Sequence, residues 1–113
     1  MATSVFRNQG AAIDYTPTSA VAAGDVVVQG ELVGVARLDI AANALGALAV
    51  DGVFQFPKTA GSGEAIAAGA LVYWDATAKV ALEDAASGAN KLIGKTVLAT
   101  LDADTSVLAR LSQ

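Results

Sequence analysis

Apolar residues along this chain occur in short runs, and glycines separate the runs at intervals of about ten residues. The runs are rich in Val and Leu, and several alternate with polar residues, as half-buried strands do. Turns at the glycines would join such strands into sheets. The pattern predicts short strands near residues 5–9, 11–15, 25–29, 31–37, 47–50, 52–56, 71–75, 79–82, 91–98 and 106–111.

Alanine-rich segments favour helix locally, because Ala has the highest helix propensity. Residues 39–48 are the best helical candidate, with room for about two turns. Gly or Asn interrupts every such segment, so long helices are not expected. We interpret residues 57–65, 83–90 and 99–105 as loops, and the first of these as a linker between two units.

A short motif occurs twice in the chain. Residues 20–24 (Ala-Val-Ala-Ala-Gly) precede one apolar strand, and residues 65–69 (Ala-Ile-Ala-Ala-Gly) precede another. Each copy is followed by a Leu-(Val/Ile)-Gly segment, at residues 32–34 and at residues 92–94. The sequence therefore predicts one small β unit that is used twice.

The length of 113 residues is that of one domain. We expect a single domain over residues 1–113, with an N-terminal arm (1–9), a first β unit (20–58) and a second β unit (65–113). The expected fold is mainly β: a compact β-barrel-like or β-sandwich-like domain of short strands. It should contain at most one or two short helices and an internal quasi-repeat.

Composition limits both the core and the partners. Hydrophobic residues make up 54% of the chain, but many are Ala, so the core depends on Val, Leu and a few aromatic residues. Such a core is marginal, and contact with further subunits would add stability. The net charge of −4 disfavours nucleic acid and anionic membranes. No apolar run has the length of a signal peptide or a membrane span, so we expect synthesis in the cytosol.

The chain contains no His and no Cys, which excludes serine and cysteine triads, the usual zinc sites and imidazole catalysis. No carboxylates pair at a strand end, so we expect no enzyme, no catalytic residue, no metal and no cofactor. Residues 89–96 fit a relaxed phosphate-loop pattern, but the residues after Lys95 favour a strand where that loop needs a helix. Asp102 and Asp104 are too few for a calcium site and are typical of a solvated turn.

Two pairs of aromatic residues are candidates for contacts between subunits. Phe54 and Phe56 are two positions apart, so a strand places both on one face, either in the core or on an apolar patch. Tyr73 and Trp74 are adjacent and face opposite sides of a strand. We expect one of the latter pair in the core and the other at a subunit contact, with sugar stacking as a weaker alternative.

The N-terminal arm carries Val5, Phe6, Arg7 and Gln9 ahead of Gly10. Two interpretations remain open for it. The arm is either a plain edge strand of this domain or a segment that adds to the sheet of another protein.

Several segments carry a resemblance when they are taken in order: residues 9–17, 22–27, 32–36, 46–58, 66–75 and 92–94. Together they resemble the small capsid decoration proteins, or cement proteins, of tailed phages and prophages, over nearly the whole chain. Some members of that family carry the label of predicted recombinase, which this sequence does not support because it has no credible phosphate loop.

The resemblance implies a structural virion protein that decorates the outer surface of a phage capsid as a homotrimer and stabilises it by bridging neighbouring major capsid subunits. The expected partners are the major capsid protein and further copies of this chain, without nucleic acid or membrane. Three subunits that bind together would strengthen a weak single contact. The arm of Val5, Phe6, Arg7 and Gln9 would face the shell. A tail or fibre component is the alternative, and a nucleotide-binding protein is far less favoured.

Overall fold

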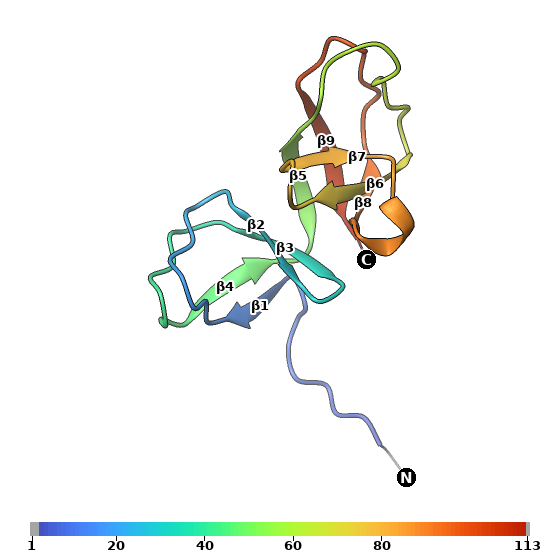
Figure 1. The fold of residues 1–113 in the computed structure, drawn as a ribbon. Helices are drawn as coiled ribbons and strands as arrows, with labels where there is room; N and C mark the ends of the chain where they lie inside the picture. The colour runs from blue at the N-terminus through green and yellow to red at the C-terminus, as the bar shows by residue number, and fades with distance from the viewer. Residues whose placement is uncertain (1–2, 113) are drawn as a thin grey trace.

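The computed structural model describes residues 3–112, which form two antiparallel sheets (Figure 1). The first sheet contains β1 (Ala12–Tyr15), β2 (Val26–Gln29), β3 (Leu32–Ala36) and β4 (Gly46–Ala49). The second contains β5 (Gly52–Pro57), β6 (Leu71–Asp75), β7 (Val80–Leu82), β8 (Lys91–Thr96) and β9 (Ser106–Leu111). One 3-10 turn, η1 (Ala86–Gly88), precedes β8. The prediction of a mainly β chain of short strands is confirmed.

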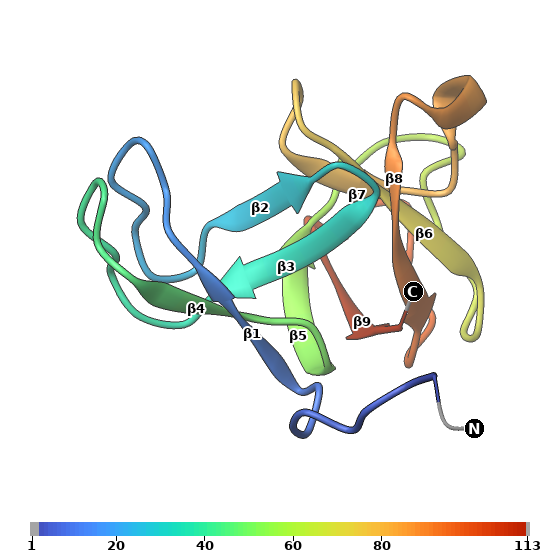
Figure 2. The ribbon, with the colours of Figure 1, turned by 90° about the horizontal axis from the view of Figure 1, so that it is seen from below.

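The two sheets form a sandwich-like pair rather than a closed barrel. The strand order is β1-β4-β3-β2 in the first sheet and β5-β9-β8-β6-β7 in the second. The second sheet curls until its edge strands β5 and β7 come into contact, but no ladder joins them. Strand β3 lies against the second sheet in both views (Figures 1 and 2) and contacts β8.

The same topology occurs twice along the chain. In each unit the first strand pairs with the last, the last with the third, and the third with the second. Residues 12–49 build this arrangement from β1 to β4, and residues 52–111 build it from β5, β6, β8 and β9. Strand β7 and η1 are additions within the second copy. Residues 52–57, which the sequence motif places in the first unit, form β5 of the second sheet.

Equivalent hydrogen bonds show that the repeated motif adopts one geometry in both units. The backbone N–H of Gly24 donates to the oxygen of Ala36 at 2.6 Å. In the second unit the N–H of Gly69 donates to the oxygen of Thr96 at 2.9 Å. Both glycines have positive φ, at 93° and 78°, a conformation that side chains with a Cβ disfavour. The glycine of the motif is therefore required by the backbone.

The equivalence extends into the loop after the third strand. The N–H of Ile40 donates to the oxygen of Val21 at 2.8 Å, which ties the loop after β3 to the segment before β2. The N–H of Thr100 donates to the oxygen of Ile66 at 2.8 Å in the same place of the second unit. The two units thus share their loop connections as well as their ladders.

Turn chemistry explains the two tight hairpins. Gly30, with φ of 61°, is the first residue of the two-residue loop between β2 and β3, where glycine is preferred. Between β6 and β7 the carboxylate of Asp75 accepts hydrogen bonds from the backbone of Thr77 at 2.9 Å and Ala78 at 3.0 Å. The N–H of Lys79 then closes the turn onto the oxygen of Asp75 at 2.7 Å. Local sequence therefore fixes where these strands reverse.

The core is divided unequally between the units. The larger cluster lies between the sheets, where Val33 and Val35 of β3 meet apolar residues of the second unit. Those residues are Phe56, Ile66, Val72, Trp74, Ala81, Ile93, Val107, Ala109 and Leu111. The smaller cluster belongs to the first unit alone and has Ala36, Ile40 and Leu48 as its buried members. The first unit therefore buries two valines against the second unit and has only a small cluster of its own.

Two predicted elements are wrong. Residues 5–9 form no strand. Residues 39–48 form no helix: they make a turn that leads into β4. Ile40 is bonded to Val21 instead of to its own segment, Asn43 has φ of 62°, and a Cβ at Gly46 would lie 2.6 Å from Ile40. Tertiary pairing thus overrides the helix propensity of the alanines.

Candidate functional site

The N-terminal arm extends away from both sheets (Figure 1). Residues 3–9 are exposed throughout, and Val5 and Phe6 keep 78% and 79% of their surface in solvent. The side chain of Asn8 bonds its neighbour Gln9 at 2.7 Å, and among the described residues we find no hydrogen bond from residues 3–9 to the body of the molecule. Met1 and Ala2, the first residues of the predicted arm, lie outside the described residues. The arm thus presents two large apolar side chains that the fold itself does not use.

Three of the four aromatic candidates pack together in the second unit, and the four differ in burial. Phe56 is 1% exposed and Trp74 is 6% exposed, and their ring centroids are 6.1 Å apart. Phe54 packs edge-on against Phe56, with centroids 6.5 Å apart, and is half-buried, as is Tyr73. Phe56 and Trp74 are core residues with almost no surface to offer a second subunit or a sugar. Of the four residues predicted to contact another subunit, only Phe54 and Tyr73 expose enough surface to do so.

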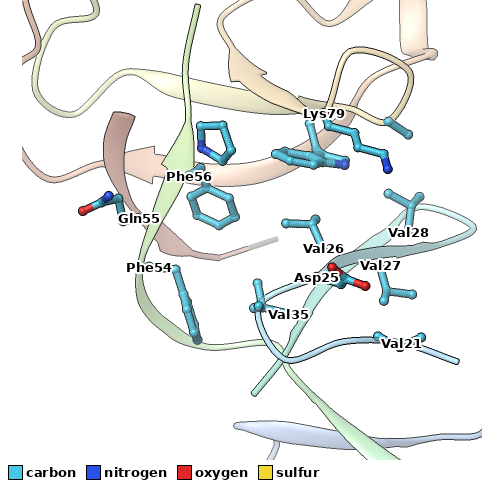
Figure 3. Close-up of a pocket in the computed structure, with 14 residues that line it drawn as sticks. Val21, Asp25, Val26, Val27, Val28, Val35, Phe54, Gln55, Phe56 and Lys79 are labelled. Atoms are coloured by element: carbon cyan, nitrogen blue, oxygen red, sulfur yellow. The ribbon is translucent and has the colours of Figure 1, made fainter. Parts of the chain in front are cut away.

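A pocket of about 640 Å³ opens between the sheets beside these rings (Figure 3). Phe54 and Phe56 line one side, and Val26, Val28 and Val35 line the other. Its lining contains two charged residues, Asp25 and Lys79. The carboxylate of Asp25 already accepts a hydrogen bond from the backbone of Ala22 at 3.0 Å. A specific ligand site needs several convergent polar groups, which this apolar gap does not supply.

The phosphate-loop match lies on a strand, as the sequence pattern predicts. Residues 91–96 form β8, and the register slips between Val72 and Tyr73 on the facing strand, which marks a bulge. A Cβ at Gly94 would overlap the carbonyl oxygen of Arg110 on β9. This glycine therefore serves close packing of two strands. No backbone loop is open to receive a phosphate there.

The acidic residues of the second unit hold a loop together, and the predicted turn is confirmed. The carboxylate of Asp102 accepts a hydrogen bond from the backbone of Ala65 at 2.8 Å. The carboxylate of Asp104 accepts one from the backbone of Leu101 at 2.9 Å. Over residues 3–112 no group of three or more His, Cys, Asp or Glu side chains is placed to hold a metal ion.

Lys58 is a buried residue that sequence reasoning missed. Only 5% of it is exposed, and its ammonium donates to the carbonyl oxygens of Thr59 at 2.9 Å, Leu101 at 3.2 Å and Asp104 at 3.1 Å. We call this arrangement the lysine clasp. It ties the end of β5 to the loop of residues 97–105, which we call the tip loop. The tip loop lies at the end of the second unit, far from the arm (Figure 1).

Exposed leucines in loops are a second feature that the sequence did not reveal. On the tip loop Leu98 and Leu101 are 59% and 73% exposed. On the first unit Leu38 and Leu45 are 78% and 71% exposed. The latter pair flanks a hollow of about 640 Å³, which we call the first-sheet groove; it is lined by residues 11–12, 37–41, 44–47, 49 and 51. The sequence signal that could have revealed them is a large apolar residue within a loop otherwise rich in Ala and Asp.

Comparison with known proteins identifies the family. A family model described as phage cement protein matches residues 7–111, which is nearly the whole chain. No curated protein and no solved structure matches the chain. Within the part of the chain that the structure describes, no helix has the length and apolarity to cross a membrane. The chain belongs to the phage cement protein family, and its role is that of a structural component of a phage capsid.

Proposed function

We propose that this member of the phage cement family decorates the outer surface of the phage head as a homotrimer. Each trimer bridges neighbouring subunits of the major capsid protein and acts without catalysis. The observation that carries the proposal is the family match over residues 7–111, to which the exposed arm adds a physical means of attachment. The protein is made in the bacterial host and acts on the particle.

The arm supplies the contact with the shell. Val5 and Phe6 are apolar and exposed, and neither packs on the sheets behind them. Burial of a large apolar side chain stabilises a complex by about 1.5–3 kcal/mol. Arg7 and Gln9 add polar groups for orientation. An extended segment of this length suits the edge of a neighbouring sheet or an apolar furrow on the shell.

Attachment through three arms explains how a small protein holds a large shell. A single arm of a few residues binds weakly, because ordering it offsets much of the gain. Three arms on one trimer make the second and third contacts intramolecular, which raises the avidity by roughly 10²–10⁴ when the geometry permits. Capsid subunits held by one trimer separate less readily under the outward pressure of packaged DNA.

The test compares the full chain with a variant that lacks residues 1–9. The truncated protein should keep its circular dichroism spectrum and melting temperature, because the arm contributes nothing to either core cluster. It should no longer decorate expanded empty heads in a sedimentation assay. Normal decoration by the truncated protein would contradict the role of the arm.

Point variants sharpen this experiment. Phe6→Ser removes an exposed apolar group from the arm, and Val53→Ser removes one from the outer face of β5, where Val53 is 54% exposed. Phe6→Ser should weaken head binding and Val53→Ser should not. Light scattering should give the mass of three chains for the full protein. Binding to purified tails instead of heads would support the alternative of a tail or fibre component.

A further inference from the structure

Two pairs of exposed leucines belong neither to the core nor to the arm. The first pair, Leu98 and Leu101, lies at the surface of the tip loop of the second unit. The second pair, Leu38 and Leu45, lies on the rim of the first-sheet groove. The two surfaces belong to different units: the tip loop projects from the end of the second unit, and the groove is a hollow on the first. Each pair of exposed leucines is a candidate for an interaction surface.

The tip loop is held in a fixed shape. The lysine clasp bonds the carbonyl oxygens of Leu101 and Asp104. The hydroxyl of Thr100 accepts a hydrogen bond from the backbone of Ile66 at 3.0 Å, and the N–H of Gly61 donates to the oxygen of Asp102 at 2.7 Å. A surface ordered before binding loses little conformational entropy when it binds. The tip loop is thus exposed to solvent but bonded at several points to the rest of the second unit.

The groove has room because its walls are small. Ala41, Ala44 and Ala47 line it between the rim residues Leu38 and Leu45. Alanine side chains leave space that bulky residues would fill, so a leucine from outside fits against an apolar floor. The groove is thus complementary in chemistry to the tip loop.

The same pairing offers one contact between opposite charges. The tip loop exposes Asp102 and Asp104, and the groove contains Arg37 beside Asp39 and Asp51. Among residues 3–112 Arg37 takes part in no ion pair, and Asp51 of the groove lies 3.7 Å from Arg110. Asp39 accepts one backbone hydrogen bond, as Asp102 and Asp104 do. The cation in the groove is therefore available to the acidic residues of the tip loop.

We propose that the tip loop of one copy packs into the first-sheet groove of the next copy, and that three such head-to-tail contacts close the ring. This inference rests on the homotrimer of the proposed function. Two different surfaces on one chain form a heterologous contact, which is the kind that generates rings. Packing three tip loops against one another on the axis is disfavoured, because it would gather Asp102 and Asp104 of every copy.

Cysteine cross-linking tests the pairing directly, because the chain has no cysteine of its own. The double variant Leu38→Cys with Leu98→Cys should give a covalent ring of three chains on mild oxidation or with a short bis-maleimide. A mixture of the two single variants should give covalent dimers, and each single variant alone should give none. Val53→Cys with Leu98→Cys is the matched control and should not cross-link.

Several outcomes overturn the inference. Covalent dimers from Leu98→Cys alone would place the tip loops together. A native protein with the mass of a trimer but no cross-link in the double variant would remove the pairing and leave the proposed function intact. A native monomer would remove both.

Solution assembly gives a second readout. Leu101→Ser and Arg37→Glu should each weaken trimer formation by roughly tenfold or more, as loss of a central contact does. Leu71→Ser, at a residue 47% exposed on β6, is the control and should leave assembly unchanged. Unchanged trimer stability in both of the first two variants would contradict the inference.

Discussion

The two units of this molecule share one topology and one set of backbone hydrogen bonds, yet they are filled differently. In the ladder, Ile13 and Tyr15 of β1 occupy the positions that Phe54 and Phe56 occupy in β5. Tyr15 stays half-buried over the small cluster, whereas Phe56 is enclosed by the large one. Backbone geometry and core filling are therefore separable in this fold. The repeat preserves the backbone geometry, whereas the side chains that fill the core differ between the units.

The loops beyond the first strands differ in the same way. Pro17 is the buried residue that follows β1, and Lys58 is its equivalent after β5. Pro17 accepts a hydrogen bond from the backbone of Asn43 at 2.7 Å through its carbonyl oxygen alone. Lys58 adds three hydrogen bonds from its side chain. The second unit thus has a rigid tip, and the first has an open groove.

The equivalent glycines of the two units give the largest expected contrast. Gly34→Ala would place a Cβ 2.9 Å from the Cβ of Leu48, and such overpacking costs about 1–3 kcal/mol. Gly94→Ala would drive its Cβ into the backbone of β9, which has no rotamer to change, so we expect a loss of about 4 kcal/mol or more. Urea denaturation at fixed protein concentration measures both. Equal losses of stability in the two variants would show that the backbone of β8 near the bulge shifts easily to admit the added Cβ.

The unequal cores give the next contrast. Phe56→Ala should destabilise the protein by about 4 kcal/mol, because the ring is fully enclosed in the large cluster. Leu48→Ala should cost about 2–3 kcal/mol, because half-exposed neighbours such as Ile13 and Val27 can close over the space. Thermal melts at one concentration provide the comparison. A larger loss for Leu48→Ala would mean that the first unit is the more tightly packed.

The lysine clasp has no side-chain counterpart in the first unit, so its removal affects one unit only. Lys58→Met leaves three carbonyl oxygens without their donor and should cost about 1–3 kcal/mol. Hydrogen exchange should increase in the tip loop and not around the first-sheet groove. Lys95→Met, at an exposed position of β8, is the control and should change little. Uniform exchange across both units would refute a local role.

The smallest effect is expected at the ion pair that joins the units. The ammonium of Lys91 lies 3.0 Å from a carboxylate oxygen of Glu31, but Glu31 is 86% exposed. Pairs of this kind contribute about 0–1 kcal/mol, so Glu31→Gln should lower stability by about 0.5 kcal/mol or less. The difference should vanish at high salt, where exposed charges are screened. A loss that persists in salt would assign the pair a structural role.

The sequence predicts the strands well because their signals are local. Alternation, β-branched runs and glycines at turns lie within a few residues of each other, as at Gly30 and Gly69, and nine of the expected strands lie where the structure has them. The repeat was visible only where the glycine motif constrains the backbone. The equivalence of β1 and β5 could not be seen in the sequence, because Ile13 and Phe54 occupy the same position in their ladders but are different residue types.

The interaction surfaces were only partly predictable. Val5 and Phe6 are apolar residues in a terminal segment, and the structure leaves them exposed. The burial of Lys58 depends on carbonyl groups more than forty positions away in the sequence, at Leu101 and Asp104, which no local pattern indicates. Lysine is also among the residues that folds bury least. The exposed leucines of the tip loop follow from that same distant arrangement.

The lysine clasp also bears on how the molecule withstands acid. Many proteins pin their loops with carboxylates, which lose their charge and their partners as protons accumulate. Peptide carbonyl oxygens have no such proton to gain, so the three acceptors around Lys58 are the same groups in an acidified medium as in a neutral one. This part of the hold on the tip loop therefore does not depend on ionised carboxylates, whereas the bonds that Asp102 and Asp104 accept from the backbone do.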